Sequence, residues 1–150
     1  MLRAGDLLAS AGGAAFQPPD WMASRGVAWD ERRNYNAPPP LRVWPGAQWQ
    51  QLSDPERVHF FATTWTVSPQ SDRVGYRLSG PPLGVSLPPL LSEPAGLGVI
   101  QLPPDGEPLV LMRDGPTVGG YPKIGVLAAE DLDWLAQCRP GQAVRFRPAN

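Results

Sequence analysis

Proline and glycine occur so often in this chain that long helices and long strands are excluded. The 16 glycines and 20 prolines account for 36 of its 150 residues. Proline inside a helix or strand removes a backbone hydrogen-bond donor, and glycine there loses more conformational entropy than any other residue. Such a composition approaches that of disordered chains. However, 42% of the residues are hydrophobic and six are tryptophan, so the chain has enough apolar surface for a folded core.

Short apolar and β-branched runs lie between the prolines and glycines, with turn-forming residues about every ten positions. This pattern predicts an all-β barrel or sandwich with about seven or eight strands and two short helices. The expected strands include residues 41–44, 62–67, 74–78, 99–102, 109–112, 124–127 and 143–146. The helices are expected at residues 53–63 and 130–137. Ser53 and Glu56 match a capping box, and Pro55 suits a first helical turn.

The N-terminal part of the chain differs from the rest in showing little periodicity. We expect residues 41–150 to form the barrel and residues 1–40 to be an N-terminal extension or covering segment. A stretch of this length without elements of its own is uncommon inside a compact domain. Trp21 and Trp29 suggest that this segment packs against the barrel or against a partner.

Charge and cysteine content exclude several classes of function. The net charge is −1 and the basic residues are scattered, so no footprint for nucleic acid is present. The single cysteine, Cys138, permits no internal disulfide, and no apolar run has the length of a membrane span. A cytoplasmic protein is therefore expected. His59 is the single histidine, which disfavours a metal site and a histidine-containing triad, so no metal ligands are predicted.

A glycine-rich loop is the first candidate site. Gly119 and Gly120 lie between Thr117, Tyr121 and Lys123, where backbone without side chains can approach a ligand closely. The alternative is a plain turn. Lys123 is the single lysine among 13 basic residues, and lysine differs from arginine in being a compact charge that can lose its proton. A solvated surface lysine is the alternative there.

A second candidate site combines charged and hydrogen-bonding side chains within six residues: Asp72, Arg73, Tyr76 and Arg77. An arginine fork can clamp an anion or carboxylate. The alternative is a surface Asp–Arg pair that stabilises a turn and contributes little energy. Gln101 is a polar amide within an expected apolar strand, and it needs a partner if it points inward.

Four segments in this order carry a resemblance to a known family: Ser68-Pro-Gln-Ser-Asp-Arg-Val-Gly-Tyr-Arg-Leu-Ser-Gly-Pro, Leu91-Ser-Glu, Ile100-Gln-Leu-Pro-Pro-Asp-Gly-Glu-Pro and Thr117-Val-Gly-Gly-Tyr-Pro-Lys-Ile. From about residue 41 onward the chain resembles the biotin-dependent carboxyltransferase family known as allophanate hydrolase subunit 2. That family includes the 5-oxoprolinase C-subunit, the KipA-like regulators and the C-terminal region of urea amidolyase. The resemblance implies a cyclophilin-like β-barrel and places this chain in the second, C-terminal half of the longer relatives.

The resemblance also implies a function in an assembly rather than alone. We expect a component of an ATP-dependent complex of 5-oxoprolinase or allophanate-hydrolase type, acting in amide hydrolysis or carboxyl transfer. The implied partners are the KipI-like companion protein of 5-oxoprolinase and a separate first barrel, with a homodimer as an alternative. ATP and biotin are implied for the assembled complex and no cofactor for this chain itself. The alternative function is a non-catalytic regulatory module that antagonises a KipI-like histidine-kinase inhibitor.

Within that hypothesis each candidate residue receives a role. Lys123 is expected to stabilise a carboxylate, phosphate or developing oxyanion, together with backbone N–H groups of the glycine pair. Asp72 and Asp105 are the available general bases, although either could simply hold a turn, as Asp105 would with Gly106. The expected substrate-binding residues are Arg73, Tyr76, Arg77, Gln101, Thr117, Gly119, Gly120 and Tyr121.

Overall fold

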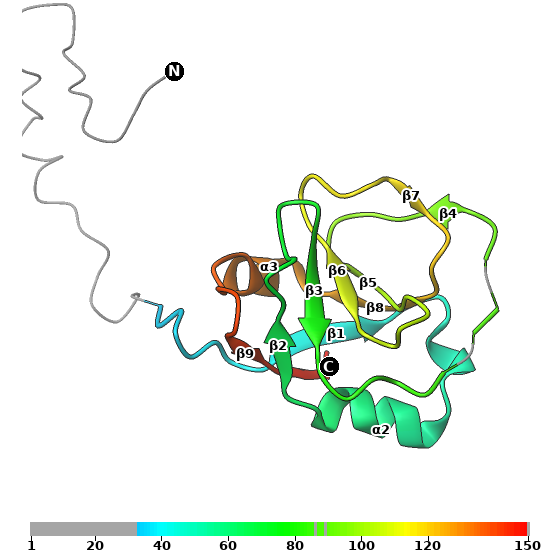
Figure 1. Cartoon of the computed structure of the whole chain (residues 1–150), viewed down its shortest axis with the longest axis horizontal. Coiled ribbons are helices and arrows are strands. Elements are labelled where there is room, and N and C mark those ends of the chain that lie inside the picture. The colour runs from blue at the N-terminus through cyan, green and yellow to red at the C-terminus, as the bar shows by residue number, and fades with distance from the viewer. Residues whose placement is uncertain (1–32, 86, 89, 150) are drawn as a thin grey trace, which may run out of the picture. The chain divides into compact units, whose positions relative to one another are not determined.

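The computed structural model describes residues 33–85, 87–88 and 90–149, and all elements lie in the unit Asn34–Asn150. Its strands are β1 (Leu41–Pro45), β2 (Trp65–Val67), β3 (Gly75–Ser79), β4 (Glu93–Pro94), β5 (Val99–Gln101), β6 (Leu109–Leu111), β7 (Val118–Gly119), β8 (Lys123–Leu127), β9 (Ala143–Val144) and β10 (Phe146–Pro148). Its helices are the 3-10 turn η2 (Trp49–Gln51) and the α-helices α2 (Asp54–Ala62) and α3 (Ala129–Ala136) (Figure 1).

Most of these elements agree with the expectation from sequence. All seven expected strands and both helices are present with shifted ends, and the expected strand at residues 143–146 is divided into β9 and β10. The pair β4–β7 and the turn η2 were missed. The capping box of α2 is confirmed, because the Ser53 N–H donates to Glu56 Oε2 over 3.1 Å.

Eight strands form one sheet in the order β10-β1-β8-β5-β6-β3-β2-β9, and β4 pairs with β7 separately. The two edge strands β9 and β10 are separated in the chain by Arg145 alone. A sheet whose opposite edges are joined by one residue must curl until those edges meet. The sheet is therefore a nearly closed barrel, which confirms the predicted all-β barrel class. In Figure 1 the β4–β7 ribbon lies on the side of this unit opposite to α3.

The barrel core is built around three aromatic side chains from different elements. Phe60 of α2 and Trp65 of β2 are both fully buried. The Phe60 ring stacks on Phe146 of β10 with centroids 4.9 Å apart and an interplanar angle of 12°. The indole Nε1 of Trp65 donates to the Phe60 carbonyl over 3.1 Å, so its one polar group is satisfied inside the core.

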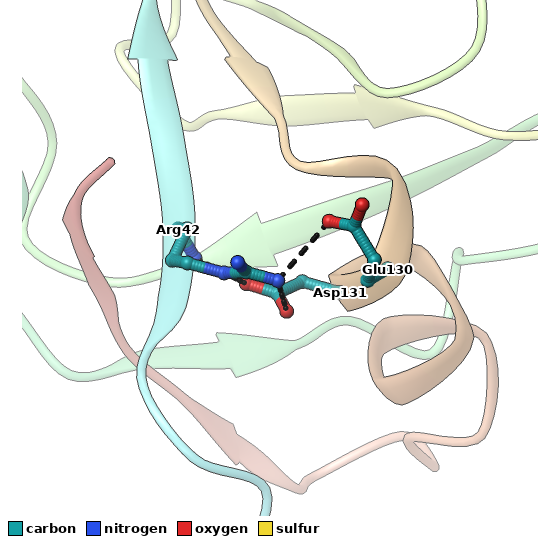
Figure 2. A network of polar contacts seen from close by, with 3 residues as sticks. All are labelled: Arg42, Glu130 and Asp131. Carbon is teal, nitrogen blue, oxygen red and sulfur yellow. Dashed lines mark hydrogen bonds and ion pairs between the residues drawn. The ribbon is translucent and has the colours of Figure 1, made fainter. Parts of the chain in front are cut away.

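An ion-pair network joins α3 to β1 (Figure 2). The Arg42 side chain donates from Nε and Nη2 to both carboxylate oxygens of Asp131, over 3.0 and 2.9 Å, and its backbone N–H donates to Asp131 over 2.6 Å. Nη2 also donates to Glu130 over 3.1 Å. Burial alone would raise the pKa of Asp131, but the hydrogen bonds and the charge of Arg42 outweigh it and lower that pKa.

The N-terminal region is described only from residue 33 onward. Tyr35 packs its ring against Trp134 with centroids 5.1 Å apart, and its carbonyl accepts a hydrogen bond from Gln142. The predictions for Trp21 and Trp29 lie outside the described residues, and the boundary at residue 41 stays a prediction. In the part of the chain that the structure describes, no helix has the length and apolarity needed to cross a membrane.

Replacing Asp131 with asparagine is expected to destabilise the fold in a pH-dependent way. The folded-state pKa of Asp131 is lowered, so its stabilising effect is complete above the unfolded pKa of about 3.9 and is lost as the pH falls through the folded value. We expect Asp131→Asn to lower the melting temperature by roughly 5 °C at pH 7, with the difference shrinking below pH ~4. Thermal unfolding followed by circular dichroism at several pH values measures this.

Glu130→Gln is the matched control, because Glu130 contacts the same guanidinium but its side chain is 74% exposed. Exposed pairs contribute little, so we expect no resolvable change in melting temperature. Equal effects of the two substitutions, or a pH-independent loss at Asp131, would contradict this account.

A second stability prediction concerns Gly125, in the interior of β8. A Cβ atom there would lie 2.6 Å from Val43 Cγ1 and 3.3 Å from Ile100 Cδ1, so β1 and β5 approach too closely for a methyl group. We expect Gly125→Ala to lower the free energy of unfolding by about 1–3 kcal/mol. Gly96→Ala is the control, because its Cβ would meet no atom within 4 Å. Urea denaturation of both variants distinguishes them, and equal losses would refute the packing argument.

Candidate functional site

A groove of about 390 Å³ brings together six of the residues that the sequence singled out. They are Asp72, Arg77, Gln101, Gly119, Gly120 and Tyr121. One wall comes from β3, β6 and the loop before β3, and the other from the segment that contains β7. Apolar side chains such as Leu109 and Leu111 complete the lining. The groove is therefore a mixed surface with a few polar groups, as is usual for small-molecule sites.

Gln101 carries an unsatisfied hydrogen-bond donor beside this groove. The residue is 3% exposed, and its side-chain nitrogen Nε2 has no hydrogen-bond partner within the described structure. A Cβ added to Gly119 would lie 2.5 Å from that nitrogen, so the bare backbone of β7 covers the amide. An orphaned buried donor costs about 1–3 kcal/mol. The expected need of Gln101 for a partner is thus unmet by the described residues.

Arg77 is the basic side chain of the groove, and its partner is Asp105. Arg77 Nη1 lies 2.9 Å from Asp105 Oδ2, and the Arg77 side chain is 30% exposed. The other oxygen of Asp105 accepts the Glu107 N–H over 3.1 Å. Gly106 has a φ of 76°, which confirms the predicted Asp-Gly turn. Asp105 thus both holds its turn and orients Arg77.

Asp72 lines the groove but is engaged by backbone. It accepts the N–H groups of Val74 and Gly75 over 2.8 and 3.2 Å, a local turn that such residues commonly stabilise. The expected pairing of an arginine with Asp72 is not formed. Arg73 pairs instead with Asp114 over 2.7 Å.

Three other candidates lie outside the groove lining. The Arg73 side chain is 86% exposed. The Tyr76 hydroxyl donates to the Ala136 carbonyl over 3.0 Å, which ties β3 to the end of α3, and burial raises the pKa of Tyr76. Thr117 is exposed, and its carbonyl accepts the Ala95 N–H over 2.9 Å. Their expected roles in substrate binding stay predictions.

Lys123 is buried and paired rather than solvated. Its side chain is 8% exposed, and Nζ lies 2.6 Å from Glu93 Oε2. The Lys123 ammonium, with its hydrogen bond and charge, lowers the pKa of Glu93. Lys123 does not belong to the groove lining, and its side chain is engaged by Glu93 of β4. The surface-lysine alternative is wrong, and the expected catalytic role of Lys123 stays a prediction.

Gln48 completes this buried polar cluster, and sequence reasoning missed it. Its Oε1 accepts the Lys123 N–H over 2.8 Å, and its own N–H donates to the Lys123 carbonyl over 3.0 Å. A side-chain hydrogen bond from Gln48 also lowers the pKa of Glu93, after the larger effect of Lys123. A glutamine between Ala47 and Trp49 carries no sequence signal for such a position.

The single cysteine and the single histidine each contact a backbone carbonyl. Cys138 is buried, and its Sγ donates to the Trp134 carbonyl over 3.2 Å. His59 is partly exposed, with Nε2 3.1 Å from the Pro81 carbonyl. Across the described ranges, no group of three histidine, cysteine or acidic side chains is gathered that could hold a metal ion.

The chain is similar to named components of bacterial enzymes. The 5-oxoprolinase C-subunit of Escherichia coli is 38% identical over 131 residues, which are 85% of this chain and 40% of that protein. The protein of the same name from Haemophilus influenzae is 38% identical over 107 residues, 71% of this chain and 35% of that protein. The chain thus spans two fifths or less of the length of these relatives.

Solved structures and a family model agree with these similarities. The urea carboxylase of Kluyveromyces lactis superposes with a TM-score of 0.66 and 27% identity, covering 74% of this chain and 11% of that one. A family model described as "Carboxyltransferase domain, subdomain A and B" matches residues 1–148. The resemblance carried by the four motifs is confirmed, and the chain belongs to this carboxyltransferase-domain family.

Proposed function

We propose that this chain is a component of an ATP-dependent complex of 5-oxoprolinase or allophanate-hydrolase type, and that its groove holds the amide carbonyl of the substrate. The observation that carries the proposal is the unpaired Nε2 of Gln101 at a groove that also contains Arg77. Both bacterial relatives are named as the C-subunit of 5-oxoprolinase, and such a component has partners.

The groove chemistry suits a small amide that carries a carboxylate. The Gln101 amide can donate to a carbonyl oxygen, which would remove the cost of leaving that donor unpaired. Arg77 offers a guanidinium of fixed position for a carboxylate, since Asp105 already orients it. 5-Oxoproline and allophanate each combine these two groups. The backbone of Gly119 and Gly120 adds a surface without side chains, which permits close approach.

The two cofactors implied for the assembly differ in their fit to this groove. A polyphosphate needs several cations, and Arg77 is the single basic side chain in the described lining, so ATP is assigned to another component of the complex. Biotin is a neutral cyclic urea with one carbonyl and an apolar body. Gln101 with Leu109, Leu111 and Tyr121 would suit such a group. Once carboxylated on a ring nitrogen and bound to a carrier, biotin would supply an activated carboxyl group.

Reconstitution of the complex tests the proposed function. The chain is analysed by size-exclusion chromatography with light scattering, alone and with a KipI-like companion protein and a separate first barrel. We expect a stable assembly that releases phosphate from ATP in the presence of 5-oxoproline or allophanate. Association without turnover would favour the regulatory module instead. Failure to associate would contradict both functions.

Replacement of Gln101 with leucine is expected to have opposite effects on stability and turnover. The change removes an unsatisfied buried donor, so the free energy of unfolding should rise by roughly 1 kcal/mol. Loss of the donor should lower kcat/KM of the assembled complex by at least about tenfold, as loss of one hydrogen bond to a substrate usually does. Urea denaturation and steady-state kinetics measure the two quantities.

Gln142→Leu is the matched control. Both polar atoms of the Gln142 amide have a partner, with Oε1 accepting the Arg139 N–H and Nε2 donating to the Tyr35 carbonyl. Its replacement should therefore destabilise the fold and leave kcat/KM unchanged. An unchanged kcat/KM in the Gln101 variant would show that this residue does not bind the substrate.

A further inference from the structure

We infer that the Glu93–Lys123 ion pair is a latch that keeps the β4–β7 ribbon closed over the Gln101 amide and so controls access of a ligand to that donor. This inference rests on the proposed function only for the identity of the ligand. The latch itself follows from how the ribbon is attached to the barrel.

The ribbon is a minimal structure that needs an anchor. Each strand has two residues, with Glu93 opposite Gly119 and Pro94 opposite Val118. An isolated two-stranded ribbon is marginal in water. Val118 is 54% exposed, so the ribbon buries little apolar surface of its own. Glu93 is the residue of β4 that reaches the barrel, through Lys123.

The anchor on the barrel side is rigid. Lys123 is the first residue of β8, and Gln48 fixes it by hydrogen bonds to both its N–H and its carbonyl. Gly46 allows this close approach, because a Cβ there would lie 2.3 Å from the Lys123 carbonyl oxygen. The backbone of Lys123 is therefore fixed, and its side chain is 8% exposed, so the ammonium attracts an opposite charge more strongly than it would in open water. Glu93, 42% exposed, is the partner that the two-residue strand β4 carries.

Closure of the ribbon and access to Gln101 exclude each other. In the closed arrangement Gly119 covers Nε2 so closely that not even a methyl group fits between them. A carbonyl oxygen can reach that donor only after Gly119 moves away. Gly119 and Glu93 are paired across the ribbon, so movement of one displaces the other. Ligand binding at Gln101 must therefore compete with the Glu93–Lys123 pair.

Weakening the latch should open the ribbon and tighten ligand binding together. A ligand that needs an open state binds with an apparent affinity proportional to the population of that state. A variant that only damages the fold would weaken binding instead. This opposite sign distinguishes a latch from a merely structural ion pair.

The test is hydrogen exchange and 5-oxoproline binding in Glu93→Gln, which keeps the shape of the side chain and removes its charge. The reporter is the Ala95 amide, which donates to Thr117 across the ribbon, and the reference is the Leu78 amide, which donates to Pro108 within the barrel. We expect about tenfold faster exchange at Ala95, an unchanged rate at Leu78, and a Kd for 5-oxoproline lowered by a similar factor. Unchanged exchange at Ala95, or equal acceleration at both amides, would overturn the latch.

Two further variants make the result decisive. Lys123→Met keeps an unbranched side chain in the buried site without its charge and should reproduce the effects of Glu93→Gln. Asp54→Asn removes a carboxylate from another pair, with Arg57 over 3.0 Å in α2, and should change neither exchange nor binding. If exchange accelerates at Ala95 but no variant binds 5-oxoproline, the latch stands and the proposed ligand fails. If binding weakens in both latch variants, the proposed ligand stands and control of access by the latch is refuted.

Discussion

The pairing of β1 with β10 is the constraint on which the rest of this structure depends. Leu41 lies opposite Phe146 in parallel register, and the Leu41 N–H donates to the Arg145 carbonyl over 2.8 Å. This pairing adds β10 beside β1 at one edge of the sheet, and β10 directly follows β9, which forms the opposite edge. Phe146 then stacks on Phe60 and so seats α2 on the barrel. The curvature that results places β3, β5 and β6 where their side chains can line a common groove.

Two ion pairs of similar chemistry have different consequences because their surroundings differ. Asp131 is bound by three donors of Arg42, so the pair fixes α3 to β1 as a static joint. Lys123 is equally well fixed, but its partner Glu93 belongs to a ribbon with little packing of its own. The same kind of ion pair thus fixes α3 to β1 permanently, whereas between β4 and β8 it forms a contact that can break. The difference lies in what the carboxylate is attached to.

Sequence reasoning predicted the barrel strands well because each has apolar residues between prolines or glycines. It missed β4 and β7 because two-residue strands show no periodicity and β4 contains a proline. The groove was partly predicted: Arg77, Gln101 and the glycine pair lie together. Lys123 was assigned to the same site because it follows the glycines in sequence. That Lys123 would be buried against Glu93 instead depends on the register of β8, which a single sequence does not reveal.

The position of β10 also determines when this barrel can form during synthesis. Leu41 leaves the ribosome long before Phe146. Until β9 and β10 have emerged, β2 and β1 each lack one of their neighbouring strands. Until then the chain must expose core side chains such as Trp65 and Ile100. Pairings so distant in sequence form slowly, which lengthens this exposed interval. The apolar strands of a newly made chain therefore stay prone to aggregation until residues 143–148 have been synthesised.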